Sequence, residues 1–192
     1  FGQMVNRMVQ ASGFQTVVLD HNPETIAVMR RFGFKGFLGD PTRPDILRKA
    51  GLQEASVLVV ALDDPKSAVS LISYARKENP HVHIVSRARD REEVYRHYQA
   101  GSNDIVREMF DSSLRAGRYV LENMGLSDFE ANEAQKLFYA HDRDSVRELA
   151  ALWRPDVPPS QNAAYVARAK ELQKDLETAF LNLGESKGKE SA

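Results

Sequence analysis

Short apolar runs that end in an acidic residue recur through the first half of this 192-residue chain. Thr16–Asp20 and Lys35–Asp40 are two such runs, and the nearly all-apolar Ser56–Leu62 is followed at once by another acid. Helical segments lie between the runs, and Asn22 and Asp64 stand before prolines, as capping residues do at helix starts. This alternation of strands with helices of about 10 to 15 residues predicts right-handed βαβ units and a parallel sheet.

The remaining periodic segments of the first half extend the same alternation. Residues 3–12 carry apolar side chains at helical spacing, and we expect a helix there that ends at Gly13. Further strands are expected at His83–Arg87 and Asp104–Val106. Because Ser56–Leu62 lacks polar alternation, it should be a strand that is buried on both faces.

The second half of the chain is expected to be helical. A proline-containing linker at 155–159 leads to a long charged helix, Ser160–Leu183, whose narrow apolar seam suits a partner helix more than a deep core. The polar tail at 184–192 is expected to be disordered. The shorter helices before the linker are predicted at Phe110–Met124, Asp128–Ala140 and Asp144–Trp153. The predicted parts are therefore 1–108 as an α/β domain, 109–154 as a helical subdomain, and 155–192 as linker, helix and tail.

Composition excludes several classes of function. A formal net charge of −1 gives no electrostatic reason to expect a nucleic-acid partner. The absence of cysteine excludes disulfides, thiolate metal ligands and a cysteine nucleophile, and it is compatible with the cytosol. No apolar run is long enough for a membrane span, and the first residues lack the pattern of a secretory signal.

Gly2 and Asp20 fit part of the dinucleotide-binding fingerprint. Gly2 can be its third glycine, which allows close packing of helix on strand, and Asp20 follows at close to the required spacing of about 20 residues. The sequence thus predicts a Rossmann-like doubly wound parallel sheet whose first strand and first two glycines are missing from this chain. Since Phe1 is not a natural start, we expect the chain to be part of a longer protein. The alternative for Asp20 is a strand-end acid that only caps a turn.

Polar clusters follow the other predicted strands at the same edge. Asp40 and Asp63 end two strands, where a bound nucleotide would lie, although aspartates before prolines also serve simply as helix starts. Arg87 and Arg89 end a third strand, where two guanidinium groups could bind phosphate or carboxylate. The alternative for these arginines is an ion pair with Asp63 or with one of the neighbouring acids Asp64 and Asp90.

No catalytic or metal-binding constellation stands out. The five histidines show no metal-ligand spacing, and we find no Ser-His-Asp arrangement, P-loop or paired catalytic carboxylates. Arg7 and Arg107 could hold an anionic ligand between them. Because dinucleotide-binding folds serve both catalysis and sensing, the missing catalytic groups favour a protein that is not an enzyme.

Several motifs, in order and spacing, resemble the potassium-transport nucleotide-binding domain, also called the regulator of potassium conductance domain. The resemblance is greatest to the cytoplasmic domain of Kef-type glutathione-gated potassium efflux systems, and it covers roughly Phe1 to Trp153. The residues that carry it are Leu19-Asp20-His21-Asn22-Pro23, Gly39-Asp40-Pro41-Thr42-Arg43, Leu62-Asp63-Asp64-Pro65, Ser86-Arg87-Ala88-Arg89-Asp90 and Val106-Arg107-Glu108-Met109-Phe110.

The resemblance implies a regulatory module on the cytoplasmic face of the inner membrane. Such a domain dimerises below a potassium/proton antiporter of the same parent chain and binds an adenine nucleotide, AMP or NAD(H). Glutathione keeps efflux shut, and bulky glutathione adducts displace it and open the system. A flavodoxin-like quinone oxidoreductase is implied as an ancillary subunit.

The resemblance also assigns roles to residues of this sequence. Asp142 falls where the family uses an asparagine from the neighbouring subunit, and an acid there would repel the carboxylates of glutathione. The other implied glutathione-binding residues are Gln3, Arg7, Phe32 and Arg107. The implied nucleotide-binding residues are Gly2, Asp20, His21, Asn22, Asp40, Thr42, Arg43, Ala61, Leu62, Asp63 and Arg87, and no residue is assigned a catalytic or metal-binding role.

Three alternative functions stay open at this point. A nucleotide-gated regulator of potassium uptake would have the same fold without glutathione control. A nicotinamide-dependent oxidoreductase would need a catalytic acid or base that we do not find. A pure dimerisation module would use the helical half and bind no nucleotide.

Overall fold

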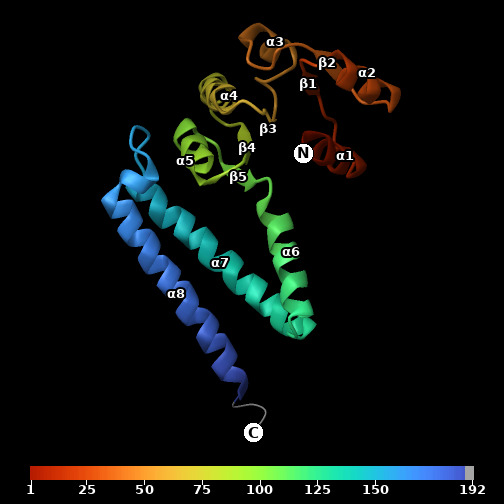
Figure 1. Ribbon diagram of the computed structural model, residues 1–192. Coiled ribbons are helices and arrows are strands. Elements are labelled where there is room, and N and C mark those ends of the chain that lie inside the picture. Colours follow the sequence, from red (N-terminus) through yellow and green to blue (C-terminus); the bar gives the residue numbers. More distant parts are fainter. Residues whose placement is uncertain (189–192) are drawn as a thin grey trace. The chain divides into compact units, whose positions relative to one another are not determined.

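Parallel strands and helices alternate through the N-terminal part of the chain, as the sequence predicts. The computed structural model describes residues 1–188 (Figure 1). The chain divides into two compact units, Phe1–Glu108 and the residues from Met109 onward. The elements of the first unit are α1 (Gly2–Ala11), β1 (Val18–Asp20), α2 (Pro23–Arg31), β2 (Gly36–Leu38), α3 (Pro44–Lys49), β3 (Val57–Val60), α4 (Pro65–Glu78), β4 (His83–Ala88), α5 (Arg91–Ala100) and β5 (Asp104–Arg107).

The strands of the first unit form two parallel sheets rather than one. One sheet pairs β1 with β2, so that Asp20 lies opposite Leu38. The other has the order β3-β4-β5, with Val60 opposite Ser86 and Ala88 opposite Arg107. Each sheet is parallel and flanked by helices, which confirms the Rossmann-like fold class.

A core between α4 and the larger sheet holds this unit together. Ile72, Ala75 and Ile84 are fully buried there, and Val60 is 1% exposed. The prediction that the third strand is buried on both faces was wrong. Val57 and Val59 are 54% and 37% exposed. Because side chains two apart lie on the same face of a strand, an unbroken apolar run does not by itself show that both faces are covered.

Local signals at the helix ends were predicted correctly. Asn22 caps α2 by accepting from the backbone N–H of Glu24 at 2.9 Å, and Asp64 caps α4 by accepting from that of Ser67 at 2.8 Å. Gly13 and Gly101 follow helix ends with φ of 89° and 104°, a conformation that glycine adopts without the steric penalty of a side chain.

The second unit is helical, with α6 (Phe110–Asn123), α7 (Asp128–Leu152), a 3₁₀ turn (Pro159–Gln161) and α8 (Ala163–Gly188). The prediction of two helices at 128–140 and 144–153 was wrong, because a single helix of 25 residues runs through both. No glycine or proline interrupts residues 141–143, so nothing there stops the helix.

The partner of α8 is α7, which runs beside it (Figure 1). Leu172 of the predicted seam is 6% exposed, and Arg168 pairs with Glu148 of α7 at 2.6 Å. The helix begins at Ala163 rather than at Ser160, because the prolines before it form a 3₁₀ turn. It also continues through Gly188, into the segment predicted to be a disordered tail. The rest of that tail, residues 189–192, lies outside the described residues.

Candidate functional site

The carboxyl ends of β1 and β2 carry the first group of predicted nucleotide-binding residues. Asp20 ends β1, and its Oδ1 accepts from the backbone N–H of Asn22 at 2.8 Å. His21 is 82% exposed, with its Nδ1 3.8 Å from the same carboxylate oxygen. Asp20 therefore does cap the turn, as its alternative reading predicted. A carboxylate oxygen accepts more than one hydrogen bond, so this bond still leaves Asp20 capacity for a ligand hydroxyl.

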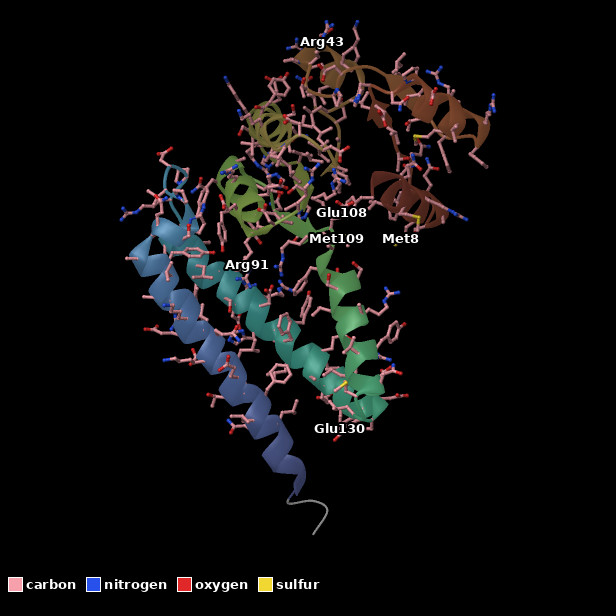
Figure 2. All side chains as sticks on the ribbon, viewed as in Figure 1. Met8, Arg43, Arg91, Glu108, Met109 and Glu130 are labelled. Atoms are coloured by element: carbon pink, nitrogen blue, oxygen red, sulfur yellow. The ribbon has the colours of Figure 1, made fainter. Side chains whose placement is uncertain are left out.

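The loop after β2 is held by Asp40. Its Oδ1 accepts from the backbone N–H of Thr42 at 2.8 Å and from the Thr42 hydroxyl at 2.6 Å. These hydrogen bonds hold the pKa of Asp40 below its ordinary value, so the carboxylate stays charged at neutral pH. Arg43, labelled in Figure 2, forms a two-pronged ion pair with Asp45, with Nε to Oδ1 at 3.1 Å and Nη2 to Oδ2 at 2.9 Å.

The loop after β3 is tied to the end of β4 by arginines. Arg87 is 9% exposed and donates from Nη2 to the carbonyl oxygen of Leu62 at 2.9 Å and to Asp63 Oδ1 at 2.6 Å. Arg89 donates to the carbonyl oxygen of Asp63 at 2.6 Å. The hydrogen bond from Arg87 lowers the pKa of Asp63. Of the two interpretations of Arg87 from sequence, the ion pair with Asp63 is therefore present.

The N-terminus of α1 lies against the same edge. A Cβ placed on Gly2 would lie 3.5 Å from the Cβ of Ala61, an ordinary contact that makes Gly2 a point of close packing between α1 and the segment after β3. The preceding Phe1 has its ring centroid 6.0 Å from the guanidinium carbon of Arg87. No side chain caps α1, and its first turn holds no acid. Uncapped N–H groups at a helix start attract an anion.

The predicted glutathione-binding residues have different surroundings. Gln3 and Arg7 on α1 are exposed, and the Arg7 guanidinium has no hydrogen bond or ion pair with any of the side chains that the structure describes or with the backbone of that part of the chain. Phe32, which directly follows α2, is 72% exposed. Arg107 ends β5 and is half-buried. Asp142 belongs to α7 in the other unit and is 4% exposed. Their joint use as one site stays a prediction.

Glu108 is the participant that sequence reasoning missed. Its two carboxylate oxygens lie 3.2 and 3.3 Å from Nη1 of Arg87, so Arg87 has acidic partners on both sides. Figure 2 labels Glu108 at the end of the N-terminal unit, directly before Met109. The signal was present, since Glu108 is another acid that follows a predicted strand, but its pairing with Arg87 depends on the register of β4 and β5.

Within the part of the chain that the structure describes, no group of three or more His, Cys, Asp or Glu side chains is arranged to hold a metal ion. None of the helices in that part is long and apolar enough to cross a membrane.

Comparison with known proteins matches both units. The TrkA-N domain matches residues 1–108, and the C-terminal domain of the potassium efflux system KefB matches residues 112–187. The glutathione-regulated potassium-efflux system protein KefC of Cronobacter sakazakii is 42% identical over 150 residues, which are 78% of this chain and 24% of that protein. The KefC protein of an Enterobacter species is 39% identical over 176 residues, 92% of this chain and 28% of that protein. The chain thus spans about a quarter of the length of these relatives.

A solved structure agrees with both matches. The AMP-bound C-terminal domain of Kef from Shewanella denitrificans superposes with a TM-score of 0.74 at 40% sequence identity, covering 80% of this chain and 94% of that one. The chain belongs to the TrkA-N domain family, in the form found in the C-terminal part of Kef-type potassium efflux systems.

Proposed function

We propose that this chain is the cytoplasmic regulatory domain of a potassium/proton antiporter and that it binds an adenine nucleotide. The observation that carries the proposal is the meeting of the uncapped N-terminus of α1 with the segment after β3, together with the acid Asp20 at the carboxyl end of β1. Helix N–H groups suit a phosphate, and a strand-end carboxylate suits ribose hydroxyls. The similar Kef domain from Shewanella denitrificans is described in its AMP-bound form, which supports AMP as the ligand.

The nucleotide proposal is tested by AMP binding to the whole chain. Replacing Asp20 by Asn removes the charged acceptor for a ribose hydroxyl, and we expect AMP affinity to fall about tenfold, the lower end for a hydrogen bond to a charged group. Asp104→Asn is the matched control, because Asp104 begins β5 and so lies at the opposite, amino edge of its sheet. Isothermal titration calorimetry measures both. Equal affinities for wild type and Asp20→Asn would contradict the assignment of Asp20.

We further propose that glutathione binds through Gln3, Arg7, Phe32 and Arg107, holding efflux shut until a bulkier adduct displaces it. The similar KefC proteins are named as glutathione-regulated, which supports this ligand. Arg7 is the anchor to test, because its exposed guanidinium has no partner in the part of the chain whose side chains are described and can be removed without breaking a bond seen there. Asp142 remains the residue proposed to weaken binding relative to an asparagine.

Glutathione binding to wild type and Arg7→Ala tests this site. Loss of one charge-assisted hydrogen bond of about 1.5–3 kcal/mol would weaken binding by about 10- to 100-fold. Arg31→Ala is the matched control, since Arg31 is also exposed at a helix end and has no described partner. A bulky S-substituted analogue should depend on Arg7 in the same way. If Arg7→Ala binds both ligands as wild type does, the assignment fails.

Regulation without catalysis fits the same residues, because the side chains at this edge are occupied in caps and ion pairs. Within the proposal, the membrane antiporter belongs to the same parent chain, and a flavodoxin-like quinone oxidoreductase would be an ancillary subunit. Turnover of a nicotinamide cofactor with any substrate would contradict a purely regulatory role. A regulator of potassium uptake would bind nucleotide but not glutathione.

A homodimer is also part of the proposal. The helix α6 has no buried residue, and large apolar side chains on and after it are exposed. These are Tyr119, Val120, Met124 and Phe129, which are 53%, 60%, 76% and 67% exposed. Exposed apolar surface of this kind is typical of an interface. Sedimentation equilibrium of the chain measures the stoichiometry, and a monomer at all concentrations would contradict this part.

A further inference from the structure

Arg87 links its own strand to three other segments of the N-terminal unit through one buried guanidinium. Its Nη2 donates to the carbonyl oxygen of Leu62 at 2.9 Å and to Asp63 Oδ1 at 2.6 Å. Its Nη1 lies 3.2 and 3.3 Å from the two carboxylate oxygens of Glu108. The ring of Phe1 lies over its guanidinium carbon at 6.0 Å. The side chain is only 9% exposed, so these protein groups, rather than water, surround its charge.

The two acids are not equivalent in their surroundings. Asp63 is 85% exposed and lies on the loop after β3, where the proposed nucleotide binds, whereas Glu108 is 33% exposed and follows β5. Burial alone would lower the pKa of Arg87, but Asp63 and Glu108 raise it above its ordinary value. A buried charge that loses one partner is strongly destabilised. Movement of Asp63 therefore changes how firmly Arg87 holds Glu108.

We propose that Arg87 is a positioning residue that transmits nucleotide occupancy from Leu62 and Asp63 to Glu108, and that it is not itself a nucleotide ligand. This inference rests on the proposed nucleotide binding. Its guanidinium nitrogens already face Leu62, Asp63 and Glu108. The backbone N–H of Glu108 also donates to the carbonyl oxygen of Ala88 at 2.9 Å, which extends the pairing of β4 with β5.

Glu108 is the last residue of the N-terminal unit, because the next residue, Met109, begins the helical unit. The ion pair with Arg87 therefore anchors the chain at the point where it leaves the N-terminal unit. A nucleotide that orders the loop at Asp63 keeps Arg87 in place, and Arg87 in turn holds Glu108. The backbone from Arg107 to Asp111 should then open less often when nucleotide is bound.

Hydrogen exchange of the whole chain with and without AMP tests the inference. In wild type, AMP should slow exchange of the amides between Arg107 and Asp111 by about fivefold, the lower end of typical coupling between sites. Glu108→Gln keeps the size of the side chain but removes its charge, which weakens the link to Arg87. We expect this variant to bind AMP with wild-type affinity by calorimetry and to lose the AMP-dependent slowing.

Glu92→Gln is the matched control. It also removes a glutamate charge from an ion pair of this unit, but that pair, with Arg96 at 3.4 Å, is exposed on α5. This variant should keep the AMP-dependent slowing. If Glu108→Gln binds AMP and retains the full slowing, the inference is overturned while the proposed function stands. If wild type does not bind AMP, the nucleotide proposal itself fails and the inference falls with it.

Discussion

The packing of α8 on α7 makes a quantitative prediction through two leucines of the same helix. Leu172 is 6% exposed, whereas Leu181 is 69% exposed. Leu→Ala at a buried site removes apolar contacts and leaves a cavity, which costs about 2–5 kcal/mol, and the narrow seam of a helix pair places Leu172 near 2–3 kcal/mol. At an exposed site the same change should cost within about 0.5 kcal/mol. Both variants make the same change in helix propensity, so the difference between their losses in free energy of unfolding measures the effect of burial.

Urea unfolding followed by tryptophan fluorescence measures this difference. Trp153, which follows α7 and is 6% exposed, is the only tryptophan of the chain and reports on the helical unit. With a slope of about 2 kcal/mol per molar urea, Leu172→Ala should lower the midpoint by about 1 M, and Leu181→Ala should leave it nearly unchanged. Equal midpoints for the two variants would refute the description of Leu172 as the buried contact of α8.

Three further predictions concern other parts of the chain. Burial lowers the pKa of His97 from its ordinary 6.5, so stability is full above pH 6.5 and is lost as the pH falls below it; far-UV circular dichroism melts should show this loss in wild type and less of it in His97→Gln. Gly101→Ala should cost about 1–2 kcal/mol in urea titrations, because φ is 104° and the new Cβ would lie 3.2 Å from Cγ of Arg76. Asn162→Ala should cost about 1–2 kcal/mol by Trp153 fluorescence, because Asn162 caps α8 and donates to the Leu152 carbonyl at 2.7 Å.

Local sequence signals predicted the start of helices well because each depends on a few neighbouring residues. Asn22 and Asp64 were each predicted to open a helix, and each accepts a hydrogen bond from a backbone N–H two or three residues later. The prediction failed at 141–143, a polar stretch that was left between two predicted helices. Polar residues alone do not end a helix; a glycine, a proline or a competing capping side chain is needed. Ser145 and Leu149, which follow this stretch, are buried on the same continuous helix.

The ends of the strands were predictable, but the partners of the side chains there were not. Alternating elements placed Asp20, Asp40 and Asp63 at carboxyl ends of strands; Asp20 is the last residue of β1, and Asp40 and Asp63 lie in the loops directly after β2 and β3. Whether Arg87 meets a ligand or an acid depends on the pairing of strands far apart in sequence. The sequence offered both possibilities, and only the register places Arg87 between Asp63 and Glu108.

The ion pairs at this edge bear on how an anionic ligand would be held. Arg43 is joined to Asp45, and Arg87 to Asp63 and Glu108, so a phosphate at either guanidinium would compete with carboxylates that already compensate its charge. For buried Arg87 the exchange would leave an acid and its own charge poorly compensated, which is costly. The N–H groups at the start of α1 are not bonded to a capping side chain, and they lie beside Ala61. We therefore expect phosphate to be bound by backbone groups, so that Arg43→Gln should change AMP affinity in calorimetry far less than Asp20→Asn, and the opposite order would place the phosphate at Arg43.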